Sequence, residues 1–171
     1  LPYAIDRKEG DLSLAQIVDI AIQFHSKHDR FFMMAEGVKI AYSGHGNDGA
    51  TNIHEVIDLD KAIQVAYQFY LQHPDETLIV VTADHETGGI NLGKADEFEL
   101  QMLQYQKCSS DQLSTRLSAL HKEKGEKLTW GQVKTLLAEN TGLYTEIELD
   151  HEEDDALQQA YKQMMRKQAT I

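Results

Sequence analysis

The sequence predicts an α/β protein whose first half alternates helices with buried strands and whose second half is largely helical. Two largely apolar segments, at 30–36 and 77–83, are expected to be strands, and the unbroken apolar run around Val80 and Val81 has the pattern of a parallel strand that is covered on both faces. Between them, an amphipathic helix begins at Asp60 and stops at His73, because Pro74 disfavours helical geometry in the residue before it. The order strand, helix, strand predicts a right-handed βαβ unit.

Two further segments precede this helix. Ser13, with Gln16 three residues later, forms a capping-box pattern and predicts the start of an amphipathic helix before the first strand. Residues 37 to about 57 are expected to form a loop of about 20 residues, a length that in compact domains usually marks a functional or disordered segment. Four glycines and His45 in this loop favour the functional interpretation.

The second strand runs directly into Asp84, His85 and the glycine turn at Gly88 and Gly89. Ligands bind at the carboxyl ends of strands in open α/β sheets, and a carboxylate next to an imidazole suits zinc. The alternative is a helix-capping Asp beside a surface His, since both residues are common in βα loops. The first strand repeats the pattern, because it ends at Glu36 and a glycine and is followed by His45.

These segments together carry a specific resemblance. TADHETGG, FFMMAEG with its following histidine, and HEVIDLDKAI occur in one order between residues 12 and 93. The chain therefore resembles the alkaline phosphatase family, particularly its bacterial members. The resemblance implies an alkaline-phosphatase-like α/β/α sandwich with parallel strands, acting on phosphate monoesters and releasing inorganic phosphate.

The resemblance also assigns metal ligands. It implies that Glu36 binds Mg²⁺, that His45 belongs to a first zinc site, and that Asp84 and His85 bind a second Zn²⁺. Magnesium prefers carboxylate and water oxygens, and two zinc ions can clamp the attacking and leaving oxygens of a displacement at phosphorus.

The chain departs from the family pattern at two points. Ala41 occupies the position, four residues before His45, where the family has an aspartate ligand, and Asp48 is only a speculative substitute. No serine lies in the Asp-Ser-Ala context of the family's nucleophile, so we expect no catalytic residue in this chain. His121 and His151 lie among charged helical residues and are expected to be solvated rather than ligands.

The second half shows helical periodicity. Helices are expected at 97–107, 110–124, 129–140 and 151–167, and Thr129 with Gln132 forms another capping-box pattern. We therefore expect an α/β metal-binding core segment at 1–93 and a mainly helical insertion or lid of the same domain at 94–171. The chain is expected to be an incomplete piece of a longer enzyme, beginning after the nucleophile and ending before the last zinc ligand.

Composition restricts the partners. The formal net charge of −12 argues against nucleic acid, and an anionic phosphate ester would need divalent cations to offset the local acidic field. A single cysteine, Cys108, excludes an internal disulfide, and no apolar run is long enough to span a membrane. The resemblance implies a periplasmic or extracellular location, with any signal peptide upstream, and exposed sheet edges favour a homodimer.

Two functions remain open at this point. The first is metal-dependent phosphomonoester hydrolysis by the parent protein, with this chain inactive alone. The second is a non-catalytic, degenerate or fragmentary relative that acts as a metal-binding or interaction module. A phosphodiesterase or phosphomutase relative is a weaker third reading, which the HETGG turn disfavours.

Overall fold

The structure, a computed structural model, describes residues 1–89 and 100–167. The chain divides into two compact units, Leu1–Phe98 and Glu99–Ile171. The expected boundary after Gly93 lies outside the described residues.

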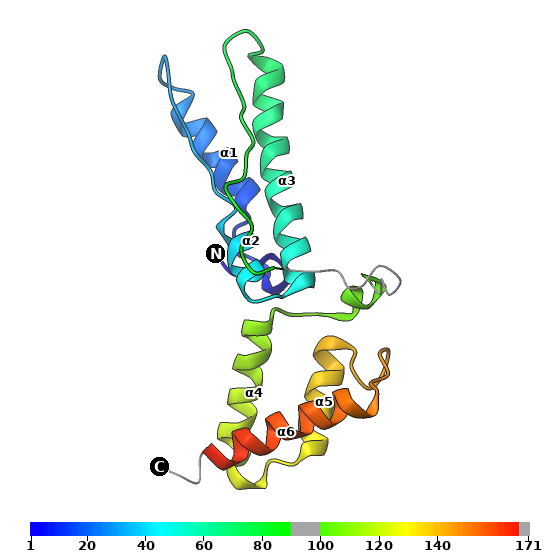
Figure 1. Cartoon of the computed structure of the whole chain (residues 1–171). Coiled ribbons are helices and arrows are strands. Elements are labelled where there is room, and N and C mark those ends of the chain that lie inside the picture. The colour runs from blue at the N-terminus through cyan, green and yellow to red at the C-terminus, as the bar shows by residue number, and fades with distance from the viewer. Residues whose placement is uncertain (90–99, 168–171) are drawn as a thin grey trace. The chain divides into compact units, whose positions relative to one another are not determined.

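The first unit is built around a pair of packed helices. In chain order it contains the 3₁₀ turn η1 (Ala4–Asp6), α1 (Leu14–His25), α2 (Val38–His45) and α3 (Gly49–Gln72). Figure 1 shows α1 running beside α3, with α2 close to the N-terminal end of α3. The buried core of this unit is Val18, Ile22 and Ala62, against which pack Leu14, Ala15, Met33, Val65, Ala66 and Phe69.

Helix α1 confirms the expected capping box. The Ser13 hydroxyl oxygen accepts from the Gln16 backbone N–H at 3.2 Å, and the Gln16 side-chain oxygen accepts from the Ser13 N–H at 2.8 Å. The expected end of the helix before Pro74 is also confirmed, because α3 stops at Gln72 and His73 caps it. Both boundaries depend on groups within four residues, and such local signals are readable in a sequence.

The expected loop at 37–57 is wrong. Most of it is helical, since α2 occupies Val38–His45 and α3 begins at Gly49, eleven residues before the expected start at Asp60. The Asp48 side chain accepts from the Thr51 N–H at 3.2 Å and so caps α3 at its true start. The glycines of this segment were interpreted as part of a functional loop, but Gly44 lies within α2 and allows close packing there, because a Cβ atom on it would collide with the Thr87 hydroxyl.

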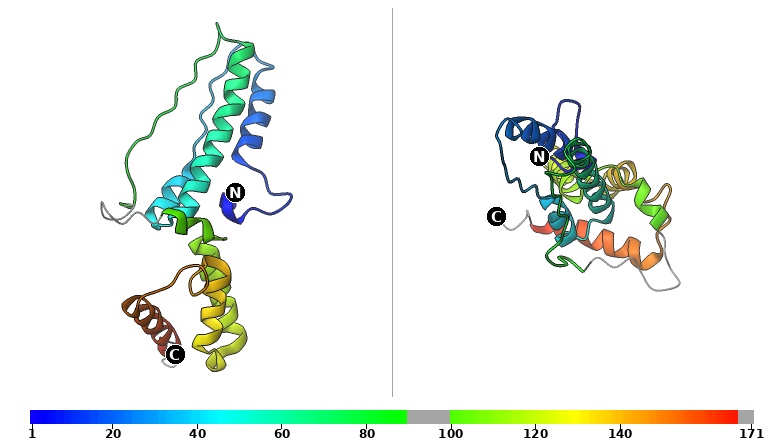
Figure 2. Two further views of the ribbon diagram at one scale, coloured as in Figure 1. Left: turned by 90° about the vertical axis from the view of Figure 1, so that its right-hand side faces the viewer. Right: turned by 90° about the horizontal axis from the view of Figure 1, so that it is seen from above.

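The two expected strands are also wrong as strands. No strand is assigned in residues 1–89 or 100–167, so the described residues do not confirm the α/β/α sandwich. In Figures 1 and 2 both segments run back from the C-terminal end of a helix toward α2, which is the common direction that a parallel pair requires. A strand completes its hydrogen bonds only with a neighbouring strand, and neither segment has one among the described residues. The apolar side chains of the two segments are therefore exposed, with Phe32 at 90% and Val80 at 72%.

The second unit is helical where it is described. It contains the 3₁₀ segment η2 (Leu100–Tyr105), α4 (Ser110–Lys124), the 3₁₀ turn η3 (Gly125–Lys127), α5 (Trp130–Thr141) and α6 (His151–Lys167). Thr129 and Gln132 form the expected capping box at the start of α5. The helices expected at 110–124, 129–140 and 151–167 are confirmed. The helix expected at 97–107 is instead a 3₁₀ segment over Leu100–Tyr105, and its first residues lie outside the described range.

The core of the second unit lies between α4, α5 and α6. Leu128, Val133 and Leu137 are buried, and the partly buried side chains packed against them are Leu113, Leu117, Leu120, Trp130, Tyr144, Leu157, Tyr161, Met164 and Met165. Helix α5 ends at Gly142, whose left-handed φ of 77° is a conformation that favours glycine. A Cβ atom there would also lie 2.6 Å from the Cβ of Tyr105.

The two histidines of this unit behave differently. His151 is exposed, as expected. His121 is not solvated, because it is only 9% exposed, and its buried Nε2 has no hydrogen-bond partner among the described residues. Its place in the last turn of α4 faces the core, which the surrounding lysines and glutamate in the sequence conceal.

Among the helices that the structure describes, none is both long and apolar enough to cross a membrane.

Candidate metal centre

Asp84 and His85 form a pair of donors at the end of the second extended segment. The Nε2 atom of His85 lies 3.3 Å from the Oδ2 atom of Asp84, and the two side chains are 69% and 85% exposed. The Nδ1 atom of His85 lies 2.6 Å from the carbonyl oxygen of Glu86, so Nδ1 is the protonated nitrogen that donates this bond. Metal-binding histidines commonly have one ring N–H held in this way by a backbone carbonyl, and the other ring nitrogen, Nε2, here lies beside a carboxylate oxygen.

The electrostatics of this pair favour charge on both members. The backbone N–H of His85 donates to the Asp84 carboxylate, and with the nearby imidazole it holds the pKa of Asp84 below its ordinary value. The bond to the Glu86 carbonyl, followed by the charge of Asp84, raises the pKa of His85. Both shifts are surface effects and are screened by solvent.

The glycine turn after this pair packs directly against α2. A Cβ atom placed on Gly88 would collide with the carbonyl of Gly44, and one placed on Gly44 would collide with the Thr87 hydroxyl. The turn is closed by the Glu86 carboxylate, which accepts from the Gly89 N–H at 2.5 Å. Two motifs separated by about 40 residues in the sequence thus touch through backbone at His45, and both glycines are needed for this contact.

The remaining expected ligands lie near α2 but do not complete a cluster. Glu36 is exposed in the extended segment just before α2, and His45 is exposed in its last turn. Ala41 lies one turn before His45 on the same helix. No group of three His, Cys, Asp or Glu side chains that could hold a metal ion together is found within residues 1–89 and 100–167. The four-residue ligand set therefore stays a prediction.

Ser43, two residues before His45 on α2, has a structural role. Ser43 is 2% exposed, and its hydroxyl lies 2.9 Å from the Lys39 carbonyl and 3.0 Å from the Ile40 carbonyl. The side-chain amide of Asn52 donates to the Ser43 oxygen at 3.0 Å and so ties α2 to α3. A buried hydroxyl with these partners is unsuited to act as a nucleophile.

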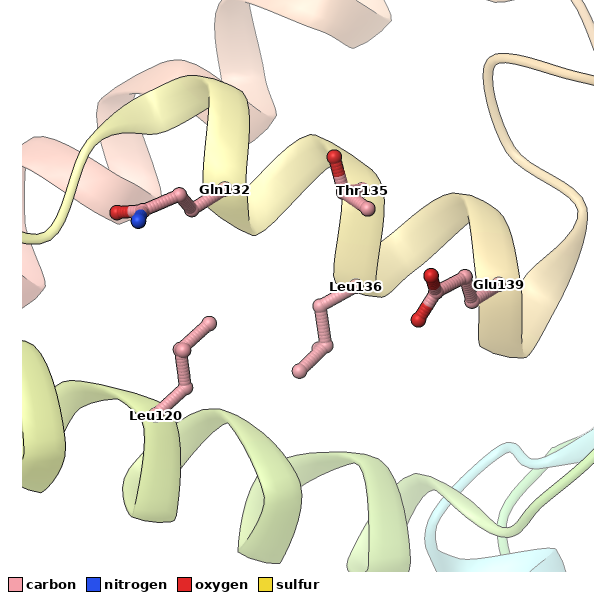
Figure 3. Close-up of a pocket in the computed structure, with 5 residues that line it drawn as sticks. All are labelled: Leu120, Gln132, Thr135, Leu136 and Glu139. Carbon is pink, nitrogen blue, oxygen red and sulfur yellow. The ribbon is translucent and has the colours of Figure 1, made fainter.

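Two cavities lie away from this site. A cleft of about 280 Å³ between α4 and α5 has Leu120 and Leu136 extending into it from opposite helices (Figure 3), with Gln132, Thr135 and Glu139 along α5. A groove of about 560 Å³ runs between α1 and α3 beside Ile22 and Phe69. Neither cavity is lined by the expected metal ligands.

Comparison with known proteins gives the family. The family model described as alkaline phosphatase matches residues 1–171, and the chain belongs to this family. It is 39% identical over 98 residues to a repressible alkaline phosphatase of Saccharomyces cerevisiae, a match covering 53% of this chain and 17% of the relative. It is 41% identical over 80 residues to an alkaline phosphatase of Escherichia fergusonii, covering 46% of this chain and 17% of the relative.

A solved structure extends the match beyond these segments. The cold-active alkaline phosphatase of the psychrophile Shewanella sp. is similar over 95% of this chain and 38% of its own, with a TM-score of 0.74 and 27% identity. The resemblance stated from the motifs is therefore confirmed. The chain spans about a fifth of the length of the curated relatives it matches.

Proposed function

We propose that a protein of the length of these relatives, containing this segment, hydrolyses phosphate monoesters to an alcohol and inorganic phosphate. The observation that carries the proposal is the contact between the Thr87–Gly88 turn and the Gly44–His45 backbone. It joins the two segments that the family resemblance marks as ligand-bearing. A chance surface Asp-His pair would not need two glycines to pack its turn against the other motif.

Zn²⁺ is proposed at Asp84 and His85. The donor set fits, because the Nε2 atom and a carboxylate oxygen lie side by side while Nδ1 is held by a backbone carbonyl. Mg²⁺ is proposed at Glu36, whose exposed carboxylate offers the hard oxygen that magnesium prefers. Bound divalent ions would offset the charge of the phosphate in a chain that carries a net charge of −12.

His45 is proposed as a ligand of a further zinc ion, but Ala41 does not fit that site because a methyl group offers no donor atom. The chain's own residues then bind and orient a phosphate through fewer metal contacts than the family pattern implies. We also propose that no nucleophile lies in residues 1–171, so that this chain alone is inactive.

A second candidate function is a non-catalytic metal-binding or interaction module. Ala41 favours it, and so do the apolar side chains of the extended segments, since Phe32, Leu78 and Val80 are between 72% and 90% exposed. Such segments offer both unpaired backbone and apolar surface to a partner, and a homodimer is one arrangement that would cover them. A periplasmic or extracellular location is proposed on family grounds alone.

The test is hydrolysis of p-nitrophenyl phosphate at alkaline pH with saturating zinc and magnesium, combined with zinc titration of the same sample. Asp84→Ala should weaken zinc binding, whereas Asp75→Ala, at another exposed aspartate of the first unit, should not. The 171-residue chain should show no turnover. Turnover that Asp84→Ala abolishes would contradict the proposed inactivity, and zinc binding indifferent to Asp84 would contradict the proposed site.

A further inference from the structure

The side chain of Asn52 joins α3 to α2. Asn52 lies in the first turn of α3, and its Nδ2 atom donates to the Ile40 carbonyl at 2.9 Å and to the Ser43 hydroxyl oxygen at 3.0 Å. A carbonyl oxygen only accepts, so the contact with Ile40 identifies which end of the amide is the nitrogen. One side chain therefore holds α2 at two residues that lie three positions apart.

Helix capping does not account for Asn52. The cap of α3 is Asp48, whose Oδ1 atom accepts from the Thr51 N–H at 3.2 Å. Asparagine is also unfavourable inside a helix, because its short polar side chain competes for nearby backbone groups. Since both hydrogen bonds of the Nδ2 atom go to α2, the side chain serves the contact between the two helices.

Gly44 connects this contact to the glycine turn. A Cβ atom on Gly44 would lie 3.7 Å from the Nδ2 atom of Asn52 and would collide with the Thr87 hydroxyl. Thr87 thus occupies the space that a side chain at Gly44 would fill, on the same side of α2 as the amide. Thr87 follows His85 by two residues, so the turn that carries the donor pair rests on the part of α2 that Asn52 holds.

We propose that Asn52 is a positioning residue of the candidate metal centre. Its two hydrogen bonds set how α2 lies on α3, and α2 in turn provides the surface on which Thr87 rests. The position of Asp84 and His85 relative to α2 therefore depends on an amide in α3. The inference rests on the proposed function for the choice of zinc, and it adds a residue from outside the expected ligand set.

The experiment compares the full 171-residue chain with three variants, all produced without a histidine tag. Asn52→Ala removes both hydrogen bonds, and Asn52→Asp keeps the shape of the side chain but replaces its donors by acceptors. Val65→Ala is the matched control, because it removes packing against the buried core of the same unit without altering α2 or the turn. Urea unfolding followed by circular dichroism measures how much stability each variant loses.

Two measurements then report on the site under conditions in which circular dichroism shows the helices intact. The nuclear Overhauser effect between the Gly44 α protons and the Thr87 side chain reports the contact of the turn with α2. Zinc titration in competition with a chelator of known affinity reports binding by the donor pair, with Asp84→Ala as the reference for its loss.

Both Asn52 variants should lose the nuclear Overhauser effect and bind zinc about tenfold more weakly, the lower end of the range for loss of an outer-shell partner. Val65→Ala should keep both properties even where it loses as much stability. The inference is overturned if either Asn52 variant keeps the nuclear Overhauser effect, or if Val65→Ala loses it too, because Asn52 would then contribute stability alone. Unchanged zinc affinity in the Asn52 variants would overturn it as well.

The failure of the proposed function has a different signature. In that case the unaltered chain has no zinc binding that Asp84→Ala removes. The nuclear Overhauser effect still decides whether Asn52 positions the turn, because this measurement needs no metal.

Discussion

The N-terminal segment is held to α3 by a buried ion pair whose removal should measurably destabilise the first unit. Arg7 donates two hydrogen bonds to the Asp58 carboxylate, at 2.7 and 2.6 Å, and the two side chains are only 16% and 6% exposed. The Leu14 N–H adds a third bond at 3.3 Å. One turn away, Glu55 accepts from the Ala4 N–H at 2.5 Å. The perturbation is Arg7→Met, which keeps a long apolar stem and removes the guanidinium.

The expected magnitude comes from the burial of the carboxylate that is left behind. Two unit charges about 4 Å apart interact by about 4 kcal/mol at an effective dielectric constant of about 20. Breaking one partner out of a buried pair commonly costs about 3–5 kcal/mol, because the other charge stays desolvated. Asp58 retains its bond from Leu14, so we expect Arg7→Met to lower the free energy of unfolding of the first unit by about 3 kcal/mol.

The pH dependence has a definite sign. Hydrogen bonding from Arg7, with the bond from Leu14 and the positive charge of Arg7, holds the pKa of Asp58 below its ordinary value despite burial. A carboxylate whose pKa is lowered by folding contributes stability above its unfolded pKa of about 3.9, and loses it as the pH falls through the folded pKa. The difference in the free energy of unfolding between the unaltered chain and Arg7→Met should therefore have its full value at pH 7 and become smaller below about pH 4.

The assay is urea unfolding followed by two signals. Far-UV circular dichroism reports the helices of both units, while fluorescence reports the second unit alone, because Trp130 is the single tryptophan of the chain. Arg30→Met, at an exposed arginine of the first unit, is the matched control. A loss under about 1 kcal/mol for Arg7→Met, or an equal loss for Arg30→Met, would refute the reasoning.

Four further outcomes are expected. Thr51→Val should raise the free energy of unfolding of the first unit, measured by thermal denaturation, by about 1 kcal/mol, because the Thr51 hydroxyl is fully buried without a partner among the described residues. Gly88→Ala should expose the turn to proteolysis, since its Cβ would collide with α2; unchanged cleavage would contradict the contact. Tyr144→Phe should destabilise the second unit in urea at pH 7, and less in acid, because the Tyr144 hydroxyl donates to Asp154 at 2.8 Å and helps to lower the pKa of that carboxyl. Phe32→Lys should leave stability unchanged while reducing self-association in light scattering.

The features that could be predicted from the sequence are those that depend on interactions between residues only a few positions apart. The capping boxes at Ser13 and Thr129 have the predicted bonds, and α3 ends before Pro74 as expected. The start of α3 was missed although its signal was present, because Asp48 followed by Gly49 was interpreted as part of a glycine-rich loop instead of a cap. His121 was missed because the charged residues beside it point outward while the imidazole is buried.

The strands could not be predicted with the same security, because a strand has no hydrogen-bonding partner within itself. An apolar run such as 77–83 reveals what the segment would bury, but its pairing depends on a neighbour that the run does not contain. In the described residues that neighbour is not present, and Leu78 and Val80 remain 87% and 72% exposed. The apolar pattern was real, and the inference from pattern to formed strand was the step that failed.

The difference between local and non-local interactions also applies to the candidate metal centre, which consists of the pair Asp84 and His85 and the more distant Glu36 and His45. Asp84 and His85 are adjacent in the chain, so one turn, closed by Glu86 and Gly89, is enough to bring their donors to 3.3 Å. Glu36 and His45 are nine residues apart, and no described group gathers them with the pair, since that would require the two extended segments to be aligned as neighbouring strands. We therefore expect that pairing those segments and completing the candidate metal centre would occur together. Any partner that aligns the backbone at 30–36 with that at 77–83 should raise metal affinity and bury Phe32 and Val80 together.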